Sequence, residues 1–370
     1  MKRIVIITPV SFRVSEREEN LYEHFNKQLE LLKFCINSIS NQSIMKYNDY
    51  EIIQFFLING IGNEIIDNFL KVNQNKYNMN IKYSNYGDNY LFPSKARNII
   101  LDFDLVKDSD YIFLLDSDDT LPPNRLLNAI SKFEKYKDTT IAITSKMNFI
   151  DINGKHLDFN LDKLTSGIMN SESIENKEGW KTFTILDKAL WFNLCGLCIK
   201  TKTMGKIKFK EIYTCEDMWL HSNLLSDSSE KVYRLLQDKE NWGNYRIHQY
   251  QFSSGIKTGV GSDYIDIVLQ ESRNSIDYLL NQKEKDGSID INEKKLLKAA
   301  NEVIIAIRQN NLRKNMESNG LDNNVIQNIR KNIAYAIENS KKYLDNNELP
   351  KLSQTIIANE YPELIKILYT

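Results

Sequence analysis

Residues 110–123 read Asp-Tyr-Ile-Phe-Leu-Leu-Asp-Ser-Asp-Asp-Thr-Leu-Pro-Pro, and no other segment says as much about the architecture of this chain. An apolar run of strand length, residues 111–115, ends abruptly in the carboxylates of Asp116, Asp118 and Asp119. Carboxylates packed this closely repel one another unless a cation lies among them. Oxygen ligands suit a hard divalent ion, Mg²⁺ or Mn²⁺. The segment therefore predicts a strand whose carboxyl end binds a metal ion and, with it, the diphosphate of a nucleotide.

The same segment also has a purely structural interpretation. Pro122 and Pro123 stop the strand and turn the chain into a helix that we expect to begin near Asn124. An acidic turn that caps this helix would explain the carboxylates without any metal. The acidic segment alone does not distinguish a metal site from a helix cap, so other segments of the chain are needed.

Length and composition restrict the number of domains and the classes of partner only loosely. With 370 residues and 42% hydrophobic content, the chain can form one large domain, or a domain with an appendage. A net charge of -1 gives no reason to expect a nucleic acid or an anionic membrane as partner. The apolar start is too short for a signal peptide, and no later stretch is long enough to span a membrane. We therefore expect a soluble, cytoplasmic protein.

The cysteines do not indicate a metal or redox centre. Cys195 and Cys198 form a Cys-x-x-Cys pair, but residues 194–199 have the apolar composition of a buried strand. A zinc site needs further ligands at suitable spacing, and a thioredoxin-like site needs the pair at the start of a helix. We expect free, buried thiols.

Strands and helices alternate along the first part of the chain. Strands are expected over 4–7, 51–58, 81–83 and 111–115, and helices over 20–40, 64–72 and 95–105. This alternation predicts parallel pairing in an α/β fold, with ligands at the carboxyl ends of the strands. Thr8, Asn59 and Asp116 stand at three such ends.

The rest of the chain changes character twice. Strands are expected over 141–145, 188–199 and 231–236, and apolar residues then recur at helical spacing over 264–280, 293–307, 325–343 and 353–369. Three glycines crowd residues 255–262 and mark a boundary. We predict an α/β domain over residues 1–258 and a helical region over residues 259–370.

Three further segments carry polar groups suited to catalysis. Lys95 and Arg97 lie at the start of the helix before the acidic strand, where cations suit a diphosphate, although they also fit an ordinary surface helix. Glu216 and Asp217 head another helix, as dipole partners or as a general base and its support. His248 precedes a Ser-Ser-Gly turn and can complete a metal shell, although a lone histidine on a strand is usually structural.

In their order along residues 1–255, these segments resemble the family 2 glycosyltransferases, which are inverting enzymes with the GT-A fold. The matching residues are Thr8-Pro9, Ser38 with Gln42, Asn85 with Gly87, Ala96-Arg97-Asn98, the run from Leu115 to Asp119, Glu216-Asp217, and Tyr245 to His248. Each motif is weak alone, but several in the right order are a specific signal.

The resemblance implies a role for each matching position. It implies a nucleotide cradle from Thr8, Pro9 and Arg97, a ribose or sugar contact from Asp116, metal binding by Asp118 with Asp116 and His248, and a general base at Asp217 supported by Glu216. It also implies Mn²⁺ or Mg²⁺ as cofactor, and a nucleotide sugar, first of all a UDP-sugar, as donor.

Two features depart from the family pattern. Where members carry Asp-Asp-Gly-Ser after the second strand, this chain has Leu-Ile-Asn-Gly-Ile at 57–61, so Asn59 is the nearest polar group for the base. The base is therefore left open. Residues 11–20 form a long, charged loop, which we expect to act as a lid over the donor.

The expected reaction is metal-dependent transfer, with inversion, from a nucleotide sugar to a hydroxyl of a glycan or lipid-linked saccharide, in surface polysaccharide or lipooligosaccharide synthesis. The alternatives are an acceptor on protein or modified DNA, or a sugar-nucleotide-binding protein without activity. A nucleotidyltransferase would need a Gly-rich basic loop after the first strand, which residues 8–12 lack. We expect the C-terminal helices to pack on the catalytic domain or to pair two subunits. The competing prediction is a face that contacts the inner side of the membrane.

Overall fold

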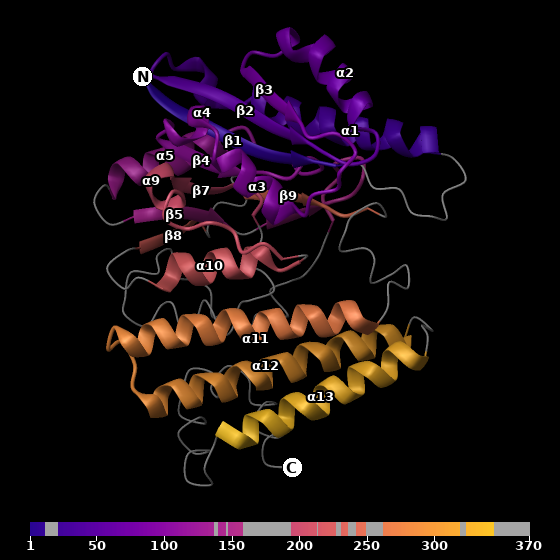
Figure 1. Ribbon diagram of the computed structural model, residues 1–370, viewed down its shortest axis with the longest axis vertical. Coiled ribbons are helices and arrows are strands. Elements are labelled where there is room, and N and C mark those ends of the chain that lie inside the picture. The colour runs from indigo at the N-terminus through magenta and orange to yellow at the C-terminus, as the bar shows by residue number, and fades with distance from the viewer. Residues whose placement is uncertain are drawn as a thin grey trace.

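The computed structural model describes residues 1–11, 21–136, 140–145, 147–157, 194–212, 214–226, 231–235, 242–248, 262–318 and 323–343. Its centre is a seven-stranded sheet in the order β3-β2-β1-β4-β7-β5-β8 (Figure 1). The strands are β1 Lys2–Val10, β2 Tyr50–Ile58, β3 Asn80–Asn85, β4 Tyr111–Leu114, β5 Thr140–Ser145, β7 Leu197–Lys200 and β8 Lys231–Leu235. A second, two-stranded parallel sheet pairs β6, Met147–Ile150, with β9, Gly243–Arg246.

All neighbours in the large sheet are parallel except β7, which runs antiparallel to both β4 and β5. The α/β fold predicted from the alternation of elements is therefore confirmed, and the predicted parallel pairing holds for every neighbouring pair except those with β7, so the sheet is mixed and mainly parallel. Alternating residues of β1 serve opposite faces of the sheet, because Ile4 and Ile6 join one apolar cluster while Val5 and Ile7 join another. A strand apolar on both sides belongs in the centre of a layered fold.

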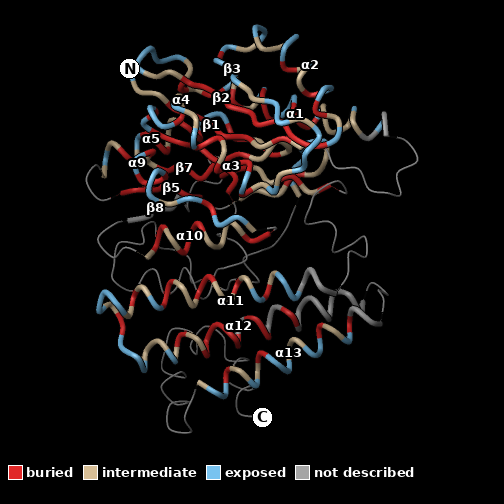
Figure 2. Tube along the Cα trace, viewed as in Figure 1, coloured by how far each residue is buried: buried red, intermediate tan, exposed pale blue. Residues whose placement is uncertain are grey.

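Helices cover both faces. They are α1 Leu21–Ser40, α2 Asn63–Asn73, α3 Pro93–Leu101, α4 Asp104–Lys107, α5 Arg125–Lys135, α9 Thr201–Met204 and α10 Glu216–Ser226, with the 3-10 turns η1 Ser43–Lys46 and η2 Gln74–Lys76. Side chains of α1, α2 and α5 pack in the cluster of Ile4 and Ile6, whereas those of α3 and α10 pack with Val5 and Ile7. Figure 2 shows the buried residues concentrated in the strands between these layers.

Three long helices follow: α11 Ser262–Lys285, α12 Ile291–Ser318 and α13 Asn323–Tyr343. In Figure 1, α10 lies between the sheet and α11, and α12 and α13 follow further from the sheet. Ile276, Leu279 and Leu280 of α11 are fully buried in the same cluster as Val5 and Ile7. The first C-terminal helix therefore packs into the core of the α/β region.

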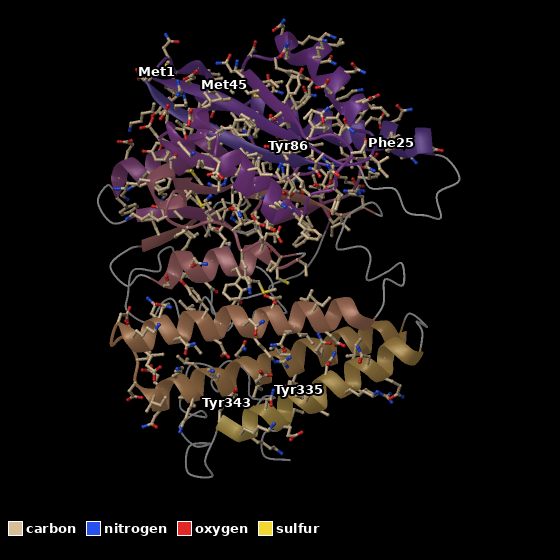
Figure 3. All side chains as sticks on the ribbon, viewed as in Figure 1. Met1, Phe25, Met45, Tyr86, Tyr335 and Tyr343 are labelled. Atoms are coloured by element: carbon tan, nitrogen blue, oxygen red, sulfur yellow. The ribbon has the colours of Figure 1, made fainter. Side chains whose placement is uncertain are left out.

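Aromatic side chains tie α13 to the other two long helices. The ring of Tyr335 lies 5.0 Å from the guanidinium of Arg273 on α11, and the ring of Tyr343 lies 5.7 Å from Nζ of Lys298 on α12 (Figure 3). Among the described residues, no helix has the length and apolar character of a membrane span. All four cysteines are free and buried, as expected.

Two predicted elements differ from the structure. The helix expected over 95–105 is two helices, because Phe103 adopts an extended backbone and its ring packs 4.8 Å from that of Phe55 on β2. Of the strand expected over 188–199, the described part begins only at Leu197, since a turn with Gly196 at φ +73° precedes it. Residues 188–193, the helix expected over 353–369 and nearly all of the expected lid lie outside the described residues.

Candidate active site

The acidic segment leaves the sheet where β4 ends. The amide of Leu115 still bonds to the carbonyl of Ile7 on β1, at 3.3 Å, so Asp116 is the first residue beyond the sheet edge. The amide of Asp119 then bonds to the carbonyl of Asp116 at 3.2 Å and closes a tight turn. This turn places the three carboxylates at the carboxyl edge of a parallel sheet, where α/β proteins bind ligands.

Two side chains at the end of α1 fix the chain beyond the acids. The hydroxyl of Ser38 accepts a hydrogen bond from the amide of Leu121 at 3.1 Å. Gln42 donates to the carbonyl of Pro122 at 2.8 Å and accepts from the amide of Leu126 at 3.1 Å. The Ser-x-x-x-Gln motif therefore holds the exit of the acidic turn, which is a structural role that sequence reasoning left unassigned.

Asp118 and His248 lie in contact. Nε2 of His248 is 2.9 Å from Oδ2 of Asp118, although the two are 130 positions apart in the chain. His248 follows β9, which Asn244 joins to Thr120 by backbone bonds of 2.9 and 3.1 Å in the two directions. The predicted pair of metal ligands is thus brought together by the second sheet.

Arg246 and Asp119 lock this arrangement. The amide of Arg246 bonds to Oδ1 of Asp119 at 2.9 Å, and its Nε bonds to the carbonyl of Asp118 at 2.7 Å. The other end of the guanidinium donates to the carbonyls of Asp151 and Ile152, each at 2.9 Å. Burial, with the charges of Asp118 and Asp116, raises the pKa of Asp119 well above its usual range. Asp119 is therefore a buried structural acid.

Arg97 joins the acidic turn to α10. Its guanidinium donates to Oδ1 of Asp116 and, at 2.7 Å, to Oε1 of Glu216. The Arg97 side chain is only 2% exposed. Burial lowers the pKa of Arg97, but the two carboxylates outweigh it and leave that pKa raised. Both terminal nitrogens thus bind carboxylates, so a phosphate would have to displace one of them to reach Arg97.

Asp217 stands at the head of α10, next to Glu216. Its Oδ1 accepts a hydrogen bond from the amide of Met218 at 2.8 Å. Burial and the charge of Glu216 raise the pKa of Asp217 to about 8. Cys215, just before the helix, has φ +67°, which is rare for a residue with a side chain. A carboxyl group with a pKa near neutrality behind a strained residue is typical of a general acid or base.

Thr8 and Asn59, two further predicted donor contacts, have structural partners. Gln54 donates to the hydroxyl of buried Thr8 at 3.2 Å. Asn59 accepts from the amide of Leu91 at 2.9 Å and donates to the carbonyl of Val10 at 3.3 Å. Pro9 is paired with the end of β2, and Lys95 is exposed on α3.

Few side chains of the site are placed to bind a metal ion. In the part of the chain that the structure describes, no three acidic, His or Cys side chains converge as a ready metal site. Asp118 and His248 are in contact, and Asp116, two positions from Asp118, is bonded to Arg97. Two carboxylates and an imidazole fit a divalent cation that takes its remaining ligands from water and substrate phosphates, as Mg²⁺ commonly does.

Comparisons with known proteins find a family match for part of the chain and support the fold. Residues 24–193 match the model of the family described as Glycosyl transferase family 2. The S. aureus TarS 1-349 structure is similar, with a TM-score of 0.53 at 13% identity, covering 100% of this chain and 89% of that chain. Its complex with UDP gives 0.51 at 13%, with the same coverage. A longer S. aureus TarS structure gives 0.50 at 13% and covers 100% of this chain and 54% of that chain.

No curated protein matches the chain. At 13% identity the TarS structures speak for the fold alone. The family model covers the strands β2 to β5 of the large sheet and the acidic turn. Residues 24–193 thus match glycosyl transferase family 2, whose members are nucleotide-sugar-dependent glycosyltransferases, and the chain has a GT-A-like α/β fold.

Proposed function

We propose that the protein transfers a sugar, with inversion and with the help of Mn²⁺ or Mg²⁺, from a nucleotide sugar to a hydroxyl of a glycan or lipid-linked saccharide. The observation that carries this proposal is the link through Arg97. It bonds Asp116, on the acidic turn, to Glu216, the neighbour of Asp217. A group suited to the diphosphate and a group suited to the acceptor hydroxyl are thus held side by side.

Asp118, Asp116 and His248 would hold the cation. A bound divalent ion neutralises the charge that develops on the departing diphosphate. Arg246 keeps the backbone of Asp118 in place through its 2.7 Å bond, so the ligands need little rearrangement. His248 is 9% exposed, which limits the competition of bulk water at that ligand.

Asp217 is the proposed general base. It takes the proton of the acceptor hydroxyl while the hydroxyl oxygen forms a bond to the anomeric carbon. The bond from that carbon to the diphosphate oxygen breaks in the same step, and the nucleoside diphosphate leaves on the opposite side. One displacement of this kind inverts the anomeric configuration. Glu216 holds the head of α10 in place through Arg97.

Thr8, Pro9, Asn59 and Lys95 are the proposed donor-side residues, and Arg97 acts on the donor side through its bond to Asp116. Thr8, Pro9 and Asn59 lie at the ends of β1 and β2, so their neighbourhood presents backbone groups to a nucleotide. Lys95 is exposed and available to a phosphate. UDP, which is bound in a TarS structure of this fold, is the first nucleotide to try.

A panel of nucleotide sugars tests the proposal. The intact protein is mixed with each donor and Mn²⁺, its melting temperature is measured, and released nucleoside diphosphate is quantified with and without a chelator. A ligand that binds the native state raises the melting temperature. We expect one donor to stabilise the protein and to be consumed only with a divalent ion, giving a product of inverted configuration by NMR. Full turnover in excess chelator would refute the role of the metal ion. A product of retained configuration would refute transfer with inversion.

The acceptor is tested separately. We place the reaction in the cytoplasm at the inner face of the membrane, where the C-terminal helices would either pair two subunits or contact lipid. Co-sedimentation with anionic vesicles and the mass from light scattering separate these two arrangements. Transfer to a protein or to modified DNA, in preference to saccharide or lipid-linked acceptors, would replace the proposed acceptor class.

A further inference from the structure

Side chains of α3 bond to a distant segment of the chain, residues 209–216. Asn98 donates to the carbonyl of Phe209 and accepts from its amide, both at 2.9 Å. The hydroxyl of Ser94 donates to the carbonyl of Ile212 at 2.9 Å and accepts from its amide at 3.3 Å. Each side chain therefore satisfies both backbone groups of one residue, more than a hundred positions away.

Arg97 extends this set of contacts. It lies on the same side of α3 as Ser94 and Asn98, because residues three and four apart share a helix face. Its guanidinium bonds to Glu216 at 2.7 Å and lies 5.5 Å from the ring of Phe209. Lys95, between them in sequence, is exposed. One buried face of α3 thus contacts the beginning, middle and end of the segment.

The segment needs such partners. Its described residues before α10 form no helix or strand, so their backbone groups have no regular partners of their own. Ser94 is fully buried and Asn98 is 6% exposed, so water does not easily replace these bonds. The segment ends at Cys215, whose φ of +67° is unfavourable and has to be held by its surroundings. Asp217 follows two positions later.

We infer that the Ser94, Arg97 and Asn98 face of α3 is a positioning template that sets the place of Asp217 at the reaction centre. These three are positioning residues, since they act through the segment 209–216 and not on the reacting atoms. The inference rests on the proposed function only for the role of Asp217 as base. It also gives the Ser-Lys-Ala-Arg-Asn sequence a task apart from donor binding.

The test uses Asn98→Ala and Ser94→Ala in the full chain, as two independent variants. The matched control is Lys208→Gln. Lys208 joins the same two regions of the chain through an ion pair with Asp102 at 3.1 Å, but both side chains are more than half exposed, at 58% and 56%. An exposed pair of this kind contributes little. The control therefore removes a connection without touching the buried template.

Hydrogen exchange is the first readout and needs no substrate. We expect Asn98→Ala to speed exchange of the Phe209 amide, and Ser94→Ala to speed exchange of the Ile212 amide, while amides of β1 and β4 remain protected. Lys208→Gln should change neither. Unchanged protection at both amides in both variants would overturn the template.

Kinetics is the second readout, with the donor found in the panel above. Misplacing a catalytic group by about 1 Å lowers the rate by up to about a hundredfold, so we expect kcat to fall tenfold to a hundredfold. The KM for the donor and the affinity for UDP with Mn²⁺ should stay the same. A loss of UDP affinity as large as the loss of kcat would assign α3 to the donor site instead. If the wild type turns over no donor, the proposed function is refuted. Hydrogen exchange then still tests the positioning template by itself, because it needs no substrate.

Discussion

The indole N–H of Trp219 donates a hydrogen bond of 2.8 Å to Oε2 of Glu271, and this bond connects α10 to α11. The ammonium group of Lys210 lies 3.3 Å from the same carboxylate oxygen and 3.7 Å from the centre of the Trp219 ring. Asp217 is only two positions from Trp219. The first C-terminal helix thus makes a polar contact close to the proposed base.

Glu271→Ala should therefore destabilise the protein. Removing the carboxylate leaves the half-buried indole N–H without this partner, which typically lowers the free energy of unfolding by about 1–3 kcal/mol. Urea denaturation at pH 7 measures the change. Gln270→Ala, at the exposed neighbouring position, is the control and should stay within about 0.5 kcal/mol of wild type. Equal stability of the two variants would mean that this contact adds nothing.

Asp118 and Asp119 are adjacent acids with different predicted roles. Asp118→Asn should lower the affinity for Mn²⁺, measured calorimetrically in the presence of UDP, by at least about tenfold, since even an outer-shell partner of a metal is worth that much. Asp119→Asn should leave the affinity unchanged, because an amide oxygen can still accept the 2.9 Å bond from Arg246. Both variants should melt cooperatively without metal. Equal losses in the two variants would contradict the assignment of Asp118 as the ligand.

Asp217→Asn should abolish most of the transfer activity. The amide keeps the shape of the side chain but cannot accept the proton, so kcat should fall by about two to four orders of magnitude. The affinity for UDP should barely change, because the proposed base acts on the acceptor and not on the nucleotide. Glu216→Gln is the companion variant, and we expect a smaller loss because it weakens only the bond to Arg97. An equal loss of UDP affinity in Asp217→Asn would place Asp217 in the donor site.

The pH dependence of activity follows from the environment of Asp217. Burial and Glu216 raise the pKa of this carboxyl group to about 8 in the free protein. A base is active only when deprotonated, so kcat/KM for the acceptor should rise with pH and level off above about pH 8. The rise should be missing from the residual activity of Asp217→Asn. An activity that is flat from pH 6 to pH 9 would contradict the role of Asp217.

The contribution of Asp217 to stability should decrease as the pH rises, whereas the activity should increase. The pKa of Asp217 is higher in the folded protein than the value of about 4 expected for an unfolded chain. Between these values the folded state binds the extra proton, so the free energy of unfolding should decrease as the pH rises from about 4 to about 8. Urea denaturation at several pH values checks this slope, which should be smaller in Asp217→Asn.

Gly243 is the position where a side chain would displace β9. A Cβ built there would lie 2.5 Å from the backbone oxygen of Cys195, which is closer than atoms can approach. We expect Gly243→Ala to lower the free energy of unfolding by about 1–3 kcal/mol and to weaken Mn²⁺ binding, because His248 follows the displaced strand. Gly205→Ala is the control, since its nearest atoms would be 3.7 Å away. Normal Mn²⁺ affinity in Gly243→Ala would show that the position of β9 does not affect metal binding.

Much of the α/β architecture could be read from local patterns. The apolar runs predicted β1, β2 and β4 in place, and the helical spacing predicted α1, α2, α11, α12 and α13. The position of Asp116 and Asp118 at the end of β4 also follows from the chain alone, because an apolar run that ends in acids has to leave the sheet there. Such features depend on neighbours in the chain and on the period of each element.

The partners of the functional side chains depended on the tertiary fold. Arg97 looked like a phosphate ligand in the sequence, yet it lies buried between Asp116 and Glu216, the latter 119 positions away. Asp119 resembled its acidic neighbours, but its contact with Arg246 makes it a structural residue. The antiparallel β7 and the insertion of α11 into the core decide which of these groups meet. Periodicity reports which face of an element is buried, whereas the identity of the group that covers it is set by the order in which distant strands and helices pack.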